Sequence, residues 1–162
     1  MITRTLAIIK PDAVNAGYTG KILDKIIQED FRILGMKQIK MSLQRAQGFY
    51  AVHTGKPFFE ELTKFMSSGP CIVLALEKEN AVDSWREVIG ATNPEEADEG
   101  TIRKEFAKNV GENAVHGSDS DENGLQEIAF FFSENLQNFS LATSSAIVKA
   151  TRQSWLPYCF SN

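Results

Sequence analysis

The segment Cys71-Ile72-Val73-Leu74-Ala75-Leu76 is an unbroken apolar run that directly follows the turn-forming pair Gly69-Pro70. A short apolar run bounded by turn residues is typical of a strand buried in a sheet. The residues from Thr3 to Lys10 have the same character, and Pro11-Asp12 ends them. We therefore predict two buried strands, one at the start of the chain and one near its middle.

Weaker patterns supply the remaining elements. Residues 31–41 alternate imperfectly around Gly35, and Ala114-Val115-His116 is strand-like. Apolar spacing and flanking residues predict helices over residues 19–30, 44–53, 58–66, 81–89, 101–108 and 122–132, with Asn80 as a possible cap of the fourth. The order βαββαβ favours an α+β fold of the ferredoxin-like kind, an antiparallel sheet with helices packed on one face, plus a C-terminal extension.

Length and composition limit the possible classes of protein. The chain has 162 residues, of which 43% are hydrophobic, and this suits one globular domain. The apolar run Leu6-Ala7-Ile8-Ile9 is too short for a signal peptide or a membrane span. We therefore expect a cytoplasmic protein with no membrane partner.

Cysteine usage and charge exclude further classes. Cys71 and Cys159 do not have the spacing of a disulfide framework or a zinc site, so both are expected to be reduced. The net charge of −4 argues against nonspecific nucleic-acid binding, which depends on basic surface. An acidic protein that handles anionic substrates must concentrate positive charge locally.

The segment Asn113-Ala114-Val115-His116-Gly117-Ser118-Asp119 carries one of only two histidines, with an amide, a hydroxyl and a carboxylate close by. An imidazole is mostly deprotonated at neutral pH, so His116 needs no separate base to attack phosphorus. A phosphoryl group on a histidine nitrogen stays reactive, which suits a carrier that must give the group away. Gly117 would permit unusual φ angles and a close approach of a polyanion.

Basic side chains outside this segment are candidates for phosphate binding. They are Lys10, Lys56, Arg86 and Arg103. Singly, each is more often a surface residue, but two arginines, a lysine and a magnesium ion would suffice for phosphoryl transfer. Residues 17–21 lack the spacing of a P-loop, and no dinucleotide-binding glycine motif is present. Phe58 could stack on a base or belong to the core.

Several segments together resemble the nucleoside diphosphate kinase family, in the family's order and over about residues 3–134. The matching segments are Ile9-Lys10-Pro11-Asp12, Phe49-Tyr50-Ala51-Val52-His53, Pro57-Phe58-Phe59, Ser68-Gly69-Pro70, Gly90-Ala91-Thr92-Asn93-Pro94, Gly100-Thr101-Ile102-Arg103 and residues 113–120. Residues 1–134 would form the kinase domain, and residues 135–162 an extension of unknown role that departs from the family pattern.

The resemblance implies a ferredoxin-like fold and a two-step exchange. A nucleoside triphosphate phosphorylates His116 on Nδ1, and a nucleoside diphosphate then collects the group. Glu127 and Ser118 would hold His116 in place. The positions matched to phosphate or ribose contacts are Lys10, Tyr50, Arg86, Thr92, Arg103 and Asn113, with His53 as a further phosphate-side residue. Those matched to base contacts are Phe58, Leu62 and Val110.

The resemblance also implies a cofactor and an assembly. Mg²⁺ would arrive with the nucleotide, and Asp119 would either reach it through water or shape the turn after Ser118. A homo-oligomer is expected, a hexamer rather than a tetramer. The tail after Ser133 is expected to dock on a neighbouring subunit, or else to be an incidental extension. Two other hypotheses stay open, a binding module that lost turnover and a relay that passes phosphate to another protein.

Overall fold

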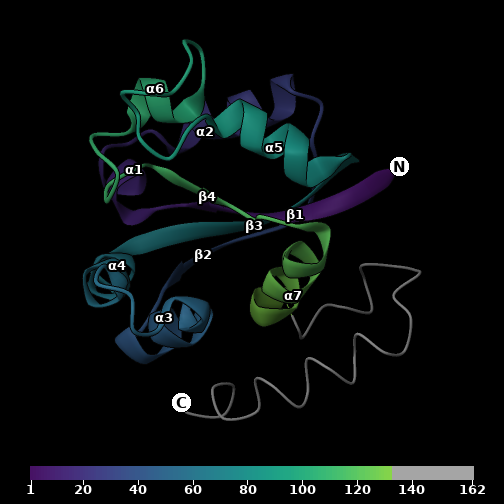
Figure 1. Ribbon diagram of the computed structural model, residues 1–162. Helices are drawn as coiled ribbons and strands as arrows, with labels where there is room; N and C mark the ends of the chain where they lie inside the picture. Colours follow the sequence, from purple (N-terminus) through teal and green to yellow (C-terminus); the bar gives the residue numbers. More distant parts are fainter. Residues whose placement is uncertain (133–162) are drawn as a thin grey trace.

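The computed structural model describes residues 1–132, and the fold is built on a four-stranded antiparallel sheet (Figure 1). The strands are β1 (Ile2–Ile9), β2 (Arg32–Lys40), β3 (Pro70–Glu79) and β4 (Val115–Gly117). Their order across the sheet is β2-β3-β1-β4. The two long apolar runs are therefore the two central strands, and the short strand that carries His116 lies at one edge.

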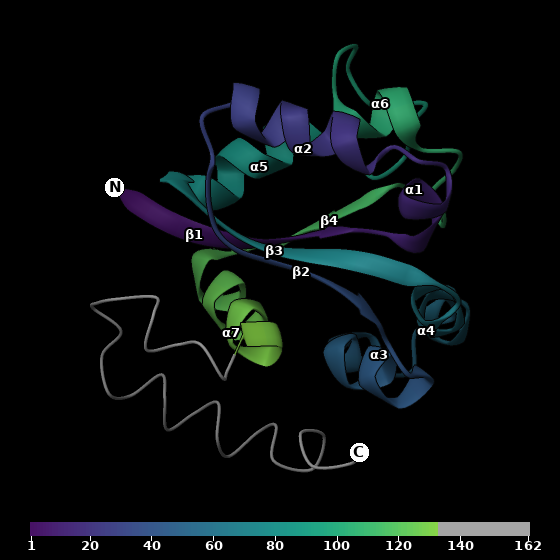
Figure 2. The same cartoon turned by 180° about the vertical axis from the view of Figure 1, so that it is seen from behind.

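Eight helical segments complete the described part of the chain. They are α1 (Pro11–Asn15), α2 (Thr19–Gln28), α3 (Leu43–Phe49), the 3₁₀ turn η1 (Ala51–His53), α4 (Phe59–Ser67), α5 (Ala81–Ile89), α6 (Ile102–Phe106) and α7 (Asp121–Phe132). Figures 1 and 2 show α1, α2, α5 and α6 on one side of the sheet and α3, α4 and α7 on the other. The predicted βαββαβ order is confirmed.

The prediction that helices cover only one face of the sheet was wrong. Side chains of β1 alternate between two separate cores: Ala7 and Ile9 pack with α2 and α5, whereas Leu6 and Ile8 pack with α3 and α7. All four are at most 1% exposed. An unbroken apolar run is what a strand needs when both of its faces are buried.

Local differences from the predicted elements have physical causes. Helix α1 was not predicted, and it is a single short turn that begins at Pro11, where a missing N–H costs nothing. Asn80 does not cap α5 with its side chain; it adopts a left-handed conformation with φ of 49°, and the Thr3 hydroxyl accepts the N–H of Ala81 at 2.8 Å. A register shift between Ile33 and Gly35 explains the broken alternation of β2.

The predictions on cysteines, membrane spans and the tail can be compared with the structure only within residues 1–132. Cys71 is a free, fully buried thiol, and burial raises its pKa to about 11. Within residues 1–132, no helix combines the length and the apolar composition that crossing a bilayer requires. Cys159 and the expected docking of the tail lie outside the described residues.

Candidate active site

His116 lies on β4 directly opposite Ile8 of β1, so the central sheet fixes its backbone. The Trp85 indole of α5 donates a hydrogen bond to the His116 carbonyl at 3.1 Å. A Cβ on Gly117 would lie 2.6 Å from Trp85 Cδ1, closer than real Cβ contacts come. Gly117 does not adopt a positive φ, so the expected unusual backbone angle is not found. The structural need for glycine here is the close packing of Trp85.

A chain of hydrogen bonds orients the imidazole. The Leu6 N–H donates to Ser118 Oγ at 3.0 Å, and the Ser118 hydroxyl donates to Glu127 Oε2 at 2.6 Å. The same carboxylate oxygen lies 3.1 Å from His116 Nε2. Because an ionised carboxylate only accepts hydrogen bonds, the neutral imidazole carries its proton on Nε2. The lone pair is then on Nδ1.

Lys10 lies at the end of β1 beside this histidine. Its ammonium donates to Asn113 Oδ1 at 2.5 Å, and the side chain is only 6% exposed. Burial, with a contribution from the nearby Arg103, lowers the pKa of Lys10 to about 8, while Asp12 acts in the opposite direction. Because little water surrounds this ammonium group to screen its charge, it attracts an anion in the cleft strongly.

Arg103 is a second buried cation, anchored by α6. Its guanidinium donates to the carbonyls of Gly90 at 2.8 Å and Val115 at 3.1 Å. Its Nε is buried and has no partner in the described part of the chain. Burial, together with the neighbouring Arg86, lowers the pKa of Arg103 to about 10. Two arginines and a lysine thus gather around β4 in a protein whose net charge is −4.

One cleft of about 990 Å³ brings the predicted residues together. The predicted residues that line it are Lys10, Tyr50, His53, Phe58, Leu62, Arg86, Thr92, Arg103, Val110, Asn113, His116, Asp119 and Glu127. Ser118 is buried behind the wall and acts through Glu127. Of the four basic candidates, Lys56 does not line the cleft.

Aromatic side chains form one wall, and the sequence indicated only some of them. Phe49 packs edge-on against the His116 ring, with centroids 5.4 Å apart, and was not predicted as a site residue. It directly precedes Tyr50 in a matched segment, which was the available signal. Burial, reinforced by Glu127, raises the pKa of Tyr50, so its phenol stays protonated. Phe58 and Val110 remain 48% and 55% exposed at this cleft.

Five further polar residues of the cleft wall were also missed. They are Glu61, Asn109, Glu112, Asn123 and Gln126. Glu112 pairs with Lys108 at 2.9 Å, and the Asn109 side chain accepts the N–H groups of Gly111 and Glu112. These residues lie on helices or in a loop and belong to no recognisable sequence motif. Their position at the cleft is therefore evident only from the tertiary structure.

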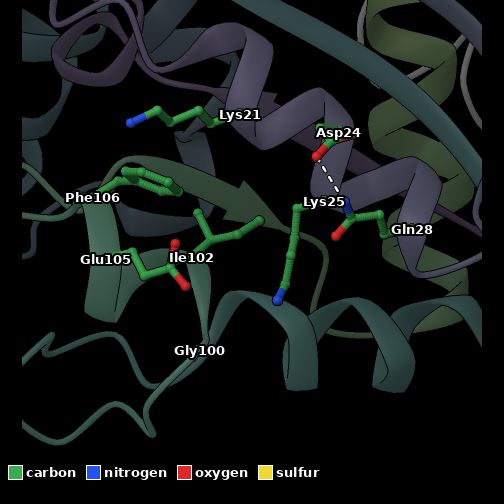
Figure 3. A pocket seen from close by; sticks show the side chains of 8 residues that line it. All are labelled: Lys21, Asp24, Lys25, Gln28, Gly100, Ile102, Glu105 and Phe106. Carbon is green, nitrogen blue, oxygen red and sulfur yellow. Dashed lines mark hydrogen bonds between the residues drawn. The ribbon is translucent and has the colours of Figure 1, made fainter.

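A smaller cavity of about 250 Å³ lies between α2 and α6 (Figure 3). Its charged lining residues are Lys21, Lys25, Asp24 and Glu105, so opposite charges balance. Figure 3 shows Gln28 donating to Asp24 at its rim. None of the predicted site residues lines this cavity. The larger cleft is therefore the candidate active site.

The described residues contain no cluster of three or more side chains suited to binding a metal ion directly. Asp119 is one of the carboxylates that line the cleft. Its Oδ1 accepts a hydrogen bond from Asn123 at 2.6 Å, and this bond lowers the pKa of Asp119. The carboxylate is therefore ionised at neutral pH, in the form that Mg²⁺ prefers.

Comparison with known proteins agrees with this geometry. The family model described as nucleoside diphosphate kinase matches residues 3–136. The nucleoside diphosphate kinase of Desulfotalea psychrophila is 58% identical over 130 residues, which cover 80% of this chain and 95% of that protein. The Brucella anthropi enzyme of the same name is 58% identical over 132 residues, or 82% and 94% of the two chains.

Solved structures give the same answer at the level of the fold. The crystal structure of Aquifex aeolicus nucleoside diphosphate kinase is 47% identical and has a TM-score of 0.80 over 82% of this chain and 96% of that one. A Halobacterium salinarum nucleoside diphosphate kinase in complex with CDP is 31% identical, with a TM-score of 0.80 over 92% and 98% of the two chains. The chain is a nucleoside-diphosphate kinase, an enzyme that transfers phosphoryl groups between nucleotides, and it belongs to the nucleoside diphosphate kinase family.

Proposed function

We propose that His116 is the nucleophile through which this kinase exchanges phosphoryl groups, in two half-reactions that use one cleft. The observation that carries the proposal is the 3.1 Å contact between His116 Nε2 and Glu127 Oε2, which is itself fixed by Ser118. This contact orients the ring and directs the lone pair of Nδ1 away from the carboxylate. A nucleophile needs such an orienting partner.

In the first half-reaction, His116 Nδ1 attacks the terminal phosphorus of a nucleoside triphosphate. A bond between nitrogen and phosphorus forms, and the bond from phosphorus to the bridging oxygen breaks. The electron pair of that bond leaves with the nucleoside diphosphate. In the second half-reaction, the terminal oxygen of another diphosphate attacks the phosphohistidine, the N–P bond breaks, and the imidazole recovers its lone pair. Glu127 stabilises the positive charge that the ring carries between the two steps.

The surrounding side chains bind and neutralise the phosphates. Lys10, Arg86 and Arg103 supply positive charge, which phosphoryl transfer requires because negative charge spreads over the transferred group. Asn113 and Thr92 supply hydrogen bonds to phosphate or ribose oxygens. Further donors are expected from Tyr50, whose hydroxyl lacks a partner among residues 1–132, and from His53.

The base is expected to lie between Phe58, Leu62 and Val110. The exposure of Phe58 and Val110 supports this, because large apolar side chains are costly to leave in water without a ligand. Stacking and apolar contact do not distinguish one base from another, so we expect many nucleoside di- and triphosphates to be substrates.

The proposed cofactor is Mg²⁺, carried by the nucleotide phosphates. Asp119 is the residue expected to hold it, through a water molecule, because its carboxylate lines the cleft and its pKa is lowered. The ion would supply neutralisation of phosphate charge. No step requires a protein residue to bind it directly.

The wider setting is also a proposal. We expect a cytoplasmic homo-oligomer, a hexamer or alternatively a tetramer, with no membrane or nucleic-acid partner. Strand β2 forms an open edge of the sheet, and Ile27 and Met36 are 62% and 52% exposed, which supports association of subunits. Residues 1–134 would be the catalytic domain and residues 135–162 an extension. Light scattering on the full chain measures the subunit number.

The test is intact mass after brief incubation with ATP and Mg²⁺, with GDP added afterwards. We expect one acid-labile phosphoryl group that GDP removes, and phosphorus NMR should assign it to Nδ1. His116→Ala should carry none. A protein that binds ATP without labelling would be a binding module, and a label that proteins but not free diphosphates remove would indicate a relay. Either result would overturn the proposed mechanism.

A further inference from the structure

The backbone just before the nucleophile is strained at Ala114. This residue joins Asn113 to strand β4 and has a φ of 65°, in a region that residues other than glycine avoid. The Val115 N–H donates to the Asn113 carbonyl at 2.7 Å, across a single residue. Such a three-residue γ-turn with positive φ is rare because it is unfavourable. Something outside the turn must therefore hold it.

The segment after β1 holds the turn from both sides. The Lys10 N–H donates to the Ala114 carbonyl at 2.8 Å, which extends the pairing of β1 with β4 by one bond. The Ala114 N–H donates to Asp12 Oδ2 at 3.0 Å. The first contact is between backbone groups, and most side chains could preserve it. The second depends on the carboxylate of Asp12.

Asp12 acts from behind the cleft. It does not line the cleft, and it is separated from Ala114 by 102 positions in the sequence. Its second oxygen, Oδ1, is buried and has no partner among the described residues. Leaving a buried carboxylate oxygen without a hydrogen bond is costly. Within the described residues, the hydrogen bond that the Asp12 carboxylate accepts is the one from the Ala114 N–H.

We propose that Asp12 is a positioning residue for phosphoryl transfer, which holds Ala114 in its strained conformation and so aligns two groups of the site. On one side of Ala114 is Asn113, which binds the Lys10 ammonium; on the other is His116, two residues along β4. Release of the turn would shift both groups relative to the bound phosphates. This inference rests on the proposed role of His116.

The experiment measures the rate of phosphohistidine formation in the full chain, by rapid quench with saturating labelled ATP and Mg²⁺, well below the melting temperature of each variant. Asp12→Ala should lower the rate by about 10- to 100-fold, the loss expected from a misplacement of about 1 Å. Asp12→Asn retains an acceptor oxygen and should stay within about threefold of the unmodified protein.

Relief of the strain should rescue the rate. Glycine adopts positive φ freely, so Ala114→Gly combined with Asp12→Ala should recover at least about fivefold. Asn80→Gly is the matched control, because Asn80 also has a positive φ, of 49°, but precedes the first residue of α5 and does not line the cleft. Asn80→Gly combined with Asp12→Ala should leave the rate as low as in Asp12→Ala alone. If Asp12 only stabilises the fold, the two glycine substitutions should restore the rate equally.

Three results would overturn the inference. The first is an Asp12→Ala rate within about twofold of the unmodified protein, and the second is equal rescue by Asn80→Gly. If Asp12→Ala does not fold, the substitution is made in the Ala114→Gly variant instead. The third result that would overturn the inference is a phosphorylation rate about tenfold lower in that double variant than in Ala114→Gly alone. Lack of label on the unmodified protein would instead overturn the proposed function, and this inference with it.

Discussion

Gly117→Ala tests the reasoning about His116 most directly. The added methyl carbon would lie 2.6 Å from Trp85 Cδ1, which is 0.8 Å less than the 3.4 Å at which ordinary contact begins. Trp85 is fully buried between α5 and the sheet, so it has no free space to enter. Either the indole or strand β4 must therefore move by most of that distance.

Two losses follow from a displacement of this size. Overpacking of a dense core costs about 1–3 kcal/mol, so the melting temperature should fall by several degrees. Movement of β4 also displaces His116 from Glu127, and a shift approaching 1 Å at a reacting group costs about 100-fold in rate. We expect phosphohistidine formation to slow by about 10- to 100-fold in protein that is still folded.

The assay is rapid-quench phosphorylation beside thermal unfolding. Gly20→Ala is the matched control, because Gly20 lies in α2 with nothing within 4 Å of an added Cβ. It should raise stability slightly and leave the rate unchanged. Trp85→Leu, combined with Gly117→Ala, removes the obstacle and should restore part of the rate. An unchanged rate in Gly117→Ala, with normal unfolding, would refute the packing argument.

Four further outcomes are expected. Ser118→Ala removes the hydroxyl that fixes Glu127 and should slow phosphorylation by about tenfold, measured by rapid quench, with little change in ATP affinity. Tyr50→Phe should leave thermal unfolding nearly unchanged, since the hydroxyl has no partner in residues 1–132, while kcat falls in a coupled assay. The affinity for ADP, measured by calorimetry, should decrease as pH rises through about 8, because Lys10 of the free enzyme then loses its charge. Burial lowers the pKa of Lys10, so at pH 7 its charged form destabilises the folded state, and Lys10→Met should raise the melting temperature. This gain should vanish as the pH rises from about 8, the folded-state pKa, to about 10.5, the ordinary pKa, because above that range Lys10 is neutral in both the folded and the unfolded state.

Much of the fold could be predicted because its signals are local. The apolar runs that became β1 and β3 are long enough to be recognised as buried strands, and the helical spacing of residues 19–30 and 81–89 is strong. The single-faced sheet was a wrong prediction because it followed from the order of the elements alone, whereas the unbroken apolar runs of β1 and β3 suit strands that are covered on both faces. Helix α1, one turn beginning at Pro11, is too short to have a period.

The amino-acid sequence by itself also identified the residues predicted to carry the chemistry, because His116 stands in a segment whose side chains suit phosphoryl transfer and whose order resembles a known family. The distances between these residues were decided only by the tertiary structure. Glu127 reaches His116 only because α7 packs on β1, and Asp12 reaches Ala114 across 102 positions. Hydrogen bonds between segments that are far apart in the sequence form only when the packing of the two cores brings those segments together. The spacing of residues along the chain does not specify these distances.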